Sequence, residues 1–330
     1  MSILKILVVE YITGGGFNKD ELPDHLANEG LMMLEALVNS LQKIDGIELI
    51  CLIDERLIER LSIKLNGANI IGTDHSFKQA FTKLLEICDA VWPIAPECDA
   101  ILQGLCETVE QSGKILLNPR ASAVAIAGNK WLTYLHLSQH RVKCVETSLL
   151  QGFVYSSGEL IIKPVDGVGC EDSYIVRNKA QFDNTVIGLH QGNYVVQPHL
   201  EGDKTSLSAL FKNGQGWLIC VNRQHFDIVD HRYRLMGITV NVTPDVTYYR
   251  ALLDAIAQAL PGLWGYAGID LIETQDGLFV LEINPRLTSS YVGIDKACHI
   301  NCAQLVLDLL NGNPRSYPKN NNPFYLDLQH

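Results

Sequence analysis

The chain has 330 residues, of which 47% are hydrophobic and 19% charged, and its formal net charge is −11. This composition is ordinary for a folded α/β protein and excludes wholesale disorder, and the length predicts two or three fused units. The negative charge argues against a nucleic-acid partner. The apolar N-terminal stretch Ile3–Val9 is too short for a signal peptide or a membrane span, so we expect a cytoplasmic protein without membrane contact.

The nine cysteines are scattered and form no CxxC pair, which is typical of reduced thiols. Cys298 and Cys302 flank His299 at helical spacing. Small core residues on one helix face explain this pattern better than a metal site does.

Up to about Asn118 the sequence alternates between strand and helix patterns, which predicts a parallel sheet with helices on both sides. The turn after the first strand is Gly14-Gly15-Gly16 rather than GxGxxG, so a dinucleotide site is not supported. The expected elements are strands over Ile3–Val9, Glu48–Ile53, Ala68–Gly72, Ala90–Pro93 and Lys114–Leu117, and a helix over Gly30–Lys43.

From Pro119 onwards, short strands mix with helices, and the tail after Gly312 is expected to be irregular. We expect three units, residues 1–117, 118–196 and 197–330, with the active site between them. The expected helices are Ala123–Gln139, Asp245–Leu260 and Asp295–Leu310; the expected strands are Lys143–Thr147, Glu159–Lys163, Tyr174–Val176, Tyr194–Gln197 and Ser206–Phe211, followed by a hairpin of Ala267–Thr274 and Leu278–Ile283.

The hairpin segment GYAGIDLIETQDGLFVLEINPRL carries the strongest chemical signal. Glu282 and Asn284 are two residues apart on one strand and share a face, which Asp270 on the partner strand can reach. Their neighbours are mostly apolar, so a plain solvent-facing strand is a poor explanation for isolated carboxylates. Oxygen ligands that converge on one face suit Mg²⁺, which completes its shell with phosphate oxygens.

Lys163 ends the run ELIIK and is followed by a loop, Asp166–Ser173, that contains Gly167 and Gly169. A lysine at this place needs an anionic partner, and glycines let backbone N–H groups approach phosphate oxygens closely. Alone, the glycine pair is a weak signal and Lys130 is best explained as a solvated helix residue. Together, the two lysines and the glycine loop predict a binding site for a triphosphate.

The segment Val195–Leu200, followed by Glu201-Gly202, is a candidate hinge for adenine. The side-chain amide of Gln197 and the backbone of Leu200 would contact the base. Taken alone, a strand that ends in a turn explains the segment equally well.

The chain resembles the ATP-grasp superfamily over about residues 118–293. The resemblance lies in the order of its features: Lys130, then Lys163 with its glycine loop, then the hinge, and finally the hairpin residues with Arg286. The resemblance implies an α/β fold with an N-terminal parallel-sheet (pre-ATP-grasp) domain and two α+β subdomains that clamp ATP. It also implies that Glu282 bridges two Mg²⁺ ions, which Mn²⁺ can replace, while Asp270 and Asn284 complete the metal shells. Arg286 and Lys163 would then be catalytic, with Arg286 stabilising an acyl-phosphate or tetrahedral intermediate.

Three further segments, VVEYITGGGF, NEGLMML and NPRLTSSYVG, look like the tyramine–L-glutamate ligases of methanofuran biosynthesis. This resemblance implies an ADP-forming carbon–nitrogen ligase that phosphorylates the γ-carboxylate of glutamate and joins it to tyramine or a similar amine. It implies amino-acid and amine substrates and allows a homodimer. The residues expected at the substrate end are Glu10, Thr13, Gly14, Gly15, Gly16, Thr288, Ser289, Ser290 and Tyr291, although a tight turn explains the three glycines equally well.

Some positions depart from the superfamily pattern. Cys170 stands where a further loop glycine is common, and Lys204 where an acidic residue often contacts ribose, so we expect Asp203 to take that role. Gly268 replaces an arginine of the D-alanine–D-alanine ligases, which counts against that substrate class. Arg223 and Arg234 are candidates to replace its charge, although each is more often a surface residue.

Two other functions stay open. A non-catalytic ATP-binding scaffold predicts loss of a metal ligand or of Arg286, and all of these residues are present. An ATP-grasp kinase, or another amino-acid or peptide ligase of the superfamily, is not excluded by any sequence feature.

Overall fold

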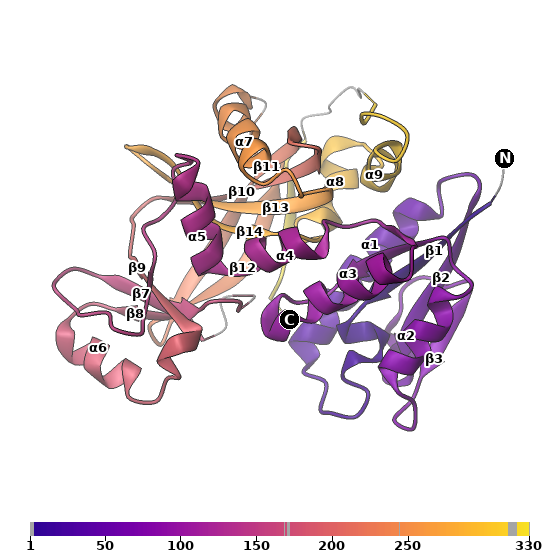
Figure 1. Cartoon of the computed structure of the whole chain (residues 1–330), viewed down its shortest axis with the longest axis horizontal. Helices are drawn as coiled ribbons and strands as arrows, with labels where there is room; N and C mark the ends of the chain where they lie inside the picture. Colours follow the sequence, from indigo (N-terminus) through magenta and orange to yellow (C-terminus); the bar gives the residue numbers. More distant parts are fainter. Residues whose placement is uncertain (1–2, 168, 170–171, 244, 316–321, 330) are drawn as a thin grey trace.

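The computed structural model describes residues 3–167, 169, 172–243, 245–315 and 322–329. Three sheets organise this part of the chain (Figure 1). None of the described helices has the length and apolar character to cross a membrane.

The N-terminal sheet is parallel throughout, with the strand order β3-β2-β1-β4-β5, which confirms the expected parallel fold. Its strands are β1 (Leu4–Glu10), β2 (Ile47–Asp54), β3 (Ala68–Ile71), β4 (Ala90–Ile94) and β5 (Ile115–Leu116). Three helices accompany it, α1 (Asp24–Leu41), α2 (Phe77–Leu85) and α3 (Ile101–Gln111), and short helical turns cover Ile12–Gly16, Glu55–Arg60 and Cys98–Ala100.

Side chains of β1 alternate between the two faces of this sheet because successive strand residues point to opposite sides. Ile6 and Val8 pack with α1, whereas Leu7 and Val9 pack with α2 and α3. Both layers are therefore covered, and the carboxyl ends of β1 and β4 meet at the edge where the strand order reverses. In open parallel sheets this edge commonly borders a ligand site.

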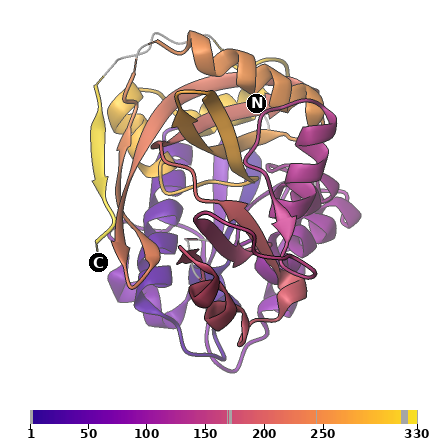
Figure 2. The same ribbon diagram turned by 90° about the vertical axis from the view of Figure 1, so that its left-hand side faces the viewer.

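A four-stranded antiparallel sheet forms a separate unit, with the strand order β6-β9-β7-β8. It consists of β6 (Ser148–Leu149), β7 (Leu160–Pro164), β8 (Tyr174–Val176) and β9 (Tyr194–Pro198), with α6 (Lys179–Val186) and a helical turn over Gln191–Asn193. Its small core lies around Ile162 and Phe182. Figure 2 views the molecule from the side of this unit, which lies in front of the other two sheets.

The third sheet has six antiparallel strands in the order β14-β13-β10-β11-β12-β15. Its strands are β10 (Asp203–Lys212), β11 (Gln215–Val229), β12 (Arg232–Val240), β13 (Gly265–Thr274), β14 (Gly277–Asn284) and β15 (Phe324–Asp327). The helix α7 (Thr247–Ala259) packs on one face. A continuous core joins the other face to the N-terminal sheet, so these two sheets form one body.

Two expected helices are each divided into two. The predicted helix Ala123–Gln139 consists of α4 (Ala121–Ala127) and α5 (Lys130–Gln139), because Gly128 ends the first and the Asn129 side chain caps the second by accepting the Leu132 N–H at 3.0 Å. The predicted helix Asp295–Leu310 consists of α8 (Tyr291–Cys298) and α9 (Cys302–Asp308).

In the second case the left-handed conformation of His299 (φ 55°) stops the helix, and Asn301 caps the next one. Cys298 and Cys302 therefore lie on different helices, and both are buried in the core, as expected. Among the described residues, no cluster of three or more His, Cys, Asp or Glu side chains is placed to hold a metal ion.

The strand predictions were wrong in three places. Residues Lys143–Thr147 form only an isolated bridge, Cys144 with Val280, and the strand begins at Ser148. The long ribbon β11–β12 was not predicted at all. The tail after Gly312 was expected to be irregular, but β15 pairs with β12.

Candidate active site

A cavity lies between the four-stranded unit and the six-stranded sheet and encloses about 1300 Å³ of empty space, part of it open to solvent. Most of the residues expected at the site line it. These are Lys130, Lys163, Gly167, Gly169, Gln197, Leu200, Asp270, Glu282, Asn284, Arg286, Thr288 and Ser289.

The hairpin β13–β14 brings the expected metal ligands together. Asp270 pairs directly with Glu282 across the two strands, and Gly268 pairs with Asn284. The Asn284 amide donates to Asp270 Oδ2 at 3.1 Å, while Gln224 on β11 donates to Asp270 Oδ1 at 3.1 Å. The period of two residues along a strand explains why the three ligands share one face.

The electrostatics of this group suit a divalent cation. Burial, and then the nearby charge of Glu282, raise the pKa of Asp270 well above its usual range. Burial alone would also raise the pKa of Glu282, but the charges of Lys130 and Lys163 hold it below its usual range. A divalent cation would relieve the repulsion between the two carboxylates, and two carboxylate groups with one amide are oxygen donors of the kind Mg²⁺ takes.

Two buried lysines stand beside the carboxylates. Lys130 is the first residue of α5, and its Nζ lies 3.4 Å from Glu282 Oε2 and donates to the Gly167 carbonyl at 2.7 Å. Lys163 on β7 places its Nζ 3.9 Å from the same carboxylate oxygen. The break between α4 and α5 thus aims Lys130 into the cavity rather than at solvent. Ammonium groups with so little exposure need anions, and phosphate oxygens would supply them.

The expected adenine hinge leads from β9 into β10. Gln197 is buried and donates its side-chain amide to Thr147 Oγ1 at 2.8 Å, and Leu200 accepts a long bond of 3.4 Å from Lys204 Nζ. Ile161 of β7, which pairs with Gln197, and Leu281 of β14 line the same cavity with apolar side chains. An apolar slot bordered by an extended backbone suits a planar base.

His199, which the sequence did not single out, fixes this hinge. Its Nδ1 lies 2.8 Å from Glu159 Oε2, and its Nε2 lies 2.6 Å from the hydroxyl of Tyr233 on β12. The backbone N–H of Ile175 on β8 also donates to His231 at the ribbon tip, at 2.8 Å. The β11–β12 ribbon therefore contacts the four-stranded unit at two places.

Arg286 is held by a carboxylate from the N-terminal sheet. Its Nε and Nη2 donate to the two oxygens of Glu97, both at 3.0 Å, and its Nη1 donates to the Leu287 carbonyl at 3.0 Å. Burial opposes the charge of Arg286, but Glu97 outweighs it, and the net pKa of the guanidinium is raised. Glu97 follows β4 at the sheet edge described above. No sequence signal links residues so far apart in the chain.

The expected substrate end contains Thr288, Ser289 and Ser290, together with Glu29 of α1. A side chain at Gly268 would place its Cβ 2.6 Å from Thr288 Cγ2, so this position has no room for an arginine. The ribbon adds an apolar wall of Phe226, Leu235 and Ile238, which the sequence analysis missed together with the ribbon itself.

Several expected residues lie outside the cavity lining. Arg223 forms an exposed ion pair with Asp203 at 3.1 Å, and Arg234 lies on the outer part of the ribbon. A substrate role for Arg223 and a ribose role for Asp203 therefore have no support from their positions. Cys170 lies outside the described residues.

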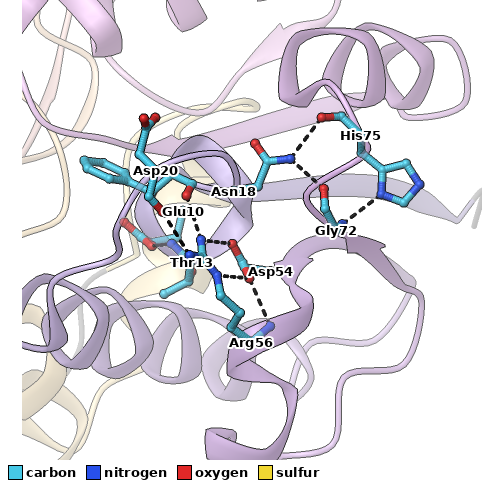
Figure 3. A network of polar contacts seen from close by, with 9 residues as sticks. Glu10, Thr13, Asn18, Asp20, Asp54, Arg56, Gly72 and His75 are labelled. Carbon is cyan, nitrogen blue, oxygen red and sulfur yellow. Dashed lines mark hydrogen bonds and ion pairs between the residues drawn. The ribbon is translucent and has the colours of Figure 1, made fainter.

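Glu10 and Thr13 belong to the network of polar contacts shown in Figure 3, and the three glycines follow Thr13 in the chain. Glu10 is buried and accepts the Thr13 N–H at 2.6 Å. Gly15 has φ +95°, and a Cβ there would stand 2.5 Å from the Ile71 side chain, while a Cβ at Gly16 would meet the Tyr11 ring. These contacts account for Gly15 and Gly16 as parts of a tight turn, and a Cβ at Gly14 would lie 3.3 Å from Leu52.

Comparison with known proteins explains this arrangement. Residues 127–290 match the ATP-grasp domain family, and residues 47–124 match the family described as pre ATP-grasp 3 domain. The chain is an ATP-grasp ligase. It is 25% identical to the tyramine–L-glutamate ligase of Methanocaldococcus jannaschii, over 99% of this chain and 96% of that protein.

Two solved structures share the ATP-grasp fold. An ATP-grasp superfamily protein from Archaeoglobus fulgidus superposes with a TM-score of 0.71 at 22% identity, over 98% of this chain and 99% of that one. The biotin carboxylase domain of the 2-oxoglutarate carboxylase from Hydrogenobacter thermophilus, solved with MgADP and bicarbonate, has a TM-score of 0.69 at 14% identity and covers 98% of this chain and 74% of that one.

Proposed function

We propose that this ATP-grasp ligase joins the γ-carboxylate of L-glutamate to tyramine or a similar aryl amine, with ATP converted to ADP and phosphate. The observation that carries the proposal is a single cavity with two kinds of wall. Buried lysines and carboxylates form one part, and Phe226, Leu235 and Ile238 form an apolar part beside Gln224. The first suits a triphosphate, and the second suits an aromatic ring. The similarity to a tyramine–L-glutamate ligase supports the same pair of substrates.

The reaction would proceed in two steps. An oxygen of the γ-carboxylate attacks the γ-phosphorus of ATP, the bond to the β-phosphate oxygen breaks, and ADP leaves. The neutral amine nitrogen then attacks the acyl carbon, the bond to the phosphate oxygen breaks, and the nitrogen gives up one proton, to the released phosphate or to water, as the amide forms. Lys130 and Lys163 would neutralise phosphate charge in the first step, and Arg286 would stabilise oxyanion charge in both.

Asp270, Glu282 and Asn284 would hold Mg²⁺, which when bound screens the phosphates from the approaching carboxylate. We further propose two ions, with Mn²⁺ able to replace them. The four-stranded unit would act as a lid that keeps water away from the acyl-phosphate, because it closes the cavity from the side opposite the hairpin.

The direct test is ADP release measured across a grid of amino acids and amines, with mass spectrometry of the product. Glutamate with an aryl amine should give the highest turnover and a γ-amide. With hydroxylamine in place of the amine, a γ-glutamyl hydroxamate should form. Arg286→Ala should slow both reactions by about 100- to 1000-fold, the usual loss on removing one oxyanion donor. Turnover that prefers another acid would contradict the proposed substrate.

Labelled oxygen separates the ligase from the kinase alternative. Glutamate labelled with ¹⁸O in its γ-carboxylate should pass one label to inorganic phosphate. A kinase that phosphorylates a hydroxyl would release ADP without an amine and transfer no label. A non-catalytic scaffold would bind ATP without releasing ADP.

A further inference from the structure

A carboxylate from helix α1, which packs on the N-terminal sheet, lines the substrate end of the cavity. Glu29 lies on α1 and lines the cavity together with Thr288, Ser289 and Ser290. Its Oε1 accepts a hydrogen bond of 2.5 Å from Ser289 Oγ. Ser289 follows Arg286 by only three residues, so the contact fixes Glu29 next to the loop that carries the catalytic arginine.

Glu29 differs from the other charged groups around it. Lys130 and Lys163 face Glu282, and Arg286 is neutralised by Glu97. Within the described part of the chain, Glu29 accepts a hydrogen bond from a neutral hydroxyl, and the nearby cation that attracts it, Arg286, is already paired with Glu97, so two carboxylates share one cation. A carboxylate that borders a cavity and has no counter-ion of its own favours a ligand that carries a positive charge.

A second acidic side chain lies next to Glu29. Glu10 lies directly behind it, because a Cβ on the neighbouring Gly30 would stand 2.6 Å from Glu10 Oε2. The arginines expected to bind a substrate carboxylate, Arg223 and Arg234, do not line the cavity. This end is therefore built to receive a cationic group.

We infer that Glu29, oriented by Ser289, binds the protonated amino group of the acyl donor and so selects an amino acid over a simple dicarboxylic acid. The inference rests on the proposed function, because it presupposes that a carboxylate is activated at Arg286. It assigns Glu29 a role in substrate selection that the sequence analysis did not identify.

The acyl donor fits this role better than the attacking amine does. An attacking amine must first lose one proton so that its nitrogen has a free lone pair, and a carboxylate that binds it as an ammonium holds it in the unreactive form. The amino group of the acyl donor takes no part in the chemistry and stays positive throughout. A fixed carboxylate is a suitable partner for a group of that kind.

The test compares two acyl donors that differ only in the amino group, L-glutamate and glutarate. Hydroxamate formation with ATP, Mg²⁺ and hydroxylamine gives kcat/KM for each donor, in the wild type and in Glu29→Gln. A hydrogen bond between charged groups contributes about 1.5–3 kcal/mol, so the wild type should prefer glutamate by about 10- to 150-fold. In Glu29→Gln the preference should disappear through a loss with glutamate alone.

Glu35→Gln is the matched control. Glu35 lies on the same helix, but its carboxylate accepts hydrogen bonds from Ser62, away from the cavity. This variant should keep the wild-type preference. It shows whether a neutral substitution on α1 disturbs the site by itself.

Each result decides a separate question. If the wild type forms hydroxamate and Glu29→Gln keeps its preference for glutamate, or loses activity equally with both donors, the inference is wrong and the proposed function stands. The same holds if the variant raises KM for the amine rather than for glutamate. If the wild type forms hydroxamate from neither donor, the proposed function itself fails and the inference falls with it.

Discussion

Replacing Glu10 with glutamine should change how the stability of the protein depends on pH. Glu10 is only 2% exposed and accepts the backbone N–H groups of Thr13 and Ile12. Burial raises the pKa of its carboxyl from 4.5 to about 7, and the charge of Glu29, the acidic group that faces it, acts in the same direction, while the hydrogen bonds oppose the shift. The folded protein therefore holds this proton more tightly than the unfolded chain does.

The sign and size follow from proton linkage. Below pH 4.5 both states carry the proton, so Glu10 has no effect on stability there. As pH rises from about 4.5 to about 7, the unfolded chain ionises first, and the folded state loses stability relative to it. At about 1.4 kcal/mol per pH unit, this window corresponds to about 3 kcal/mol, of which about 2–3 kcal/mol falls between pH 5 and pH 8.

The assay is urea unfolding of the wild type, Glu10→Gln and the exposed control Glu59→Gln at pH 5 and pH 8. Any hydrogen bond lost in Glu10→Gln costs the same at both pH values and cancels in the comparison. From pH 5 to pH 8, Glu10→Gln should therefore gain about 2–3 kcal/mol relative to the wild type, while Glu59→Gln follows the wild type. Equal pH dependence of Glu10→Gln and the wild type would refute the argument.

Three further changes test the site. Glu282→Gln keeps the volume of the side chain but removes the negative charge that faces both lysines. ADP release at saturating Mg²⁺ should therefore be lost, while the circular dichroism spectrum is retained. An unchanged rate would exclude the metal role. Lys163→Ala should weaken ATP binding and slow phosphoryl transfer, measured by calorimetry and single-turnover kinetics, and wild-type values for both would contradict the triphosphate site. Glu97→Gln breaks the buried pair with Arg286, so it should lower the free energy of unfolding by about 3 kcal/mol and reduce turnover; loss of turnover with full stability would instead indicate a direct contact with substrate.

The sequence predicted that three polar side chains meet on one face of the β13–β14 hairpin, because the features that decide this lie close together in the chain. Asp270, Glu282 and Asn284 follow from the two-residue period of strands and from a short turn, and both are visible within a few residues. Lys130 could be predicted only as a partner of Lys163, since its orientation depends on the helix break at Gly128.

The ribbon and its apolar wall could not be predicted in the same way. The segment QGWLICVNRQHFDIV begins as a buried strand and ends as an exposed one, and a bulge between His225 and Phe226 shifts the alternation midway. Glu97 and Glu29 were missed for another reason. Each acts on a residue more than 180 positions away, through contacts that only the packing of the N-terminal sheet against the six-stranded sheet creates.

The bond between Glu97 and Arg286 limits how such a protein can be recombined. The arginine lies in the segment that matches the ATP-grasp domain family, but the carboxylate that orients it lies in the segment that matches the pre ATP-grasp 3 domain. A chimera that joins this catalytic half to the N-terminal half of a relative would keep the complete β13–β14 hairpin and both lysines. Its arginine would still be left as a buried charge without a partner unless the donor supplied an acidic side chain at the end of its fourth strand. The two halves should therefore be exchanged, and should have diverged, as a matched pair.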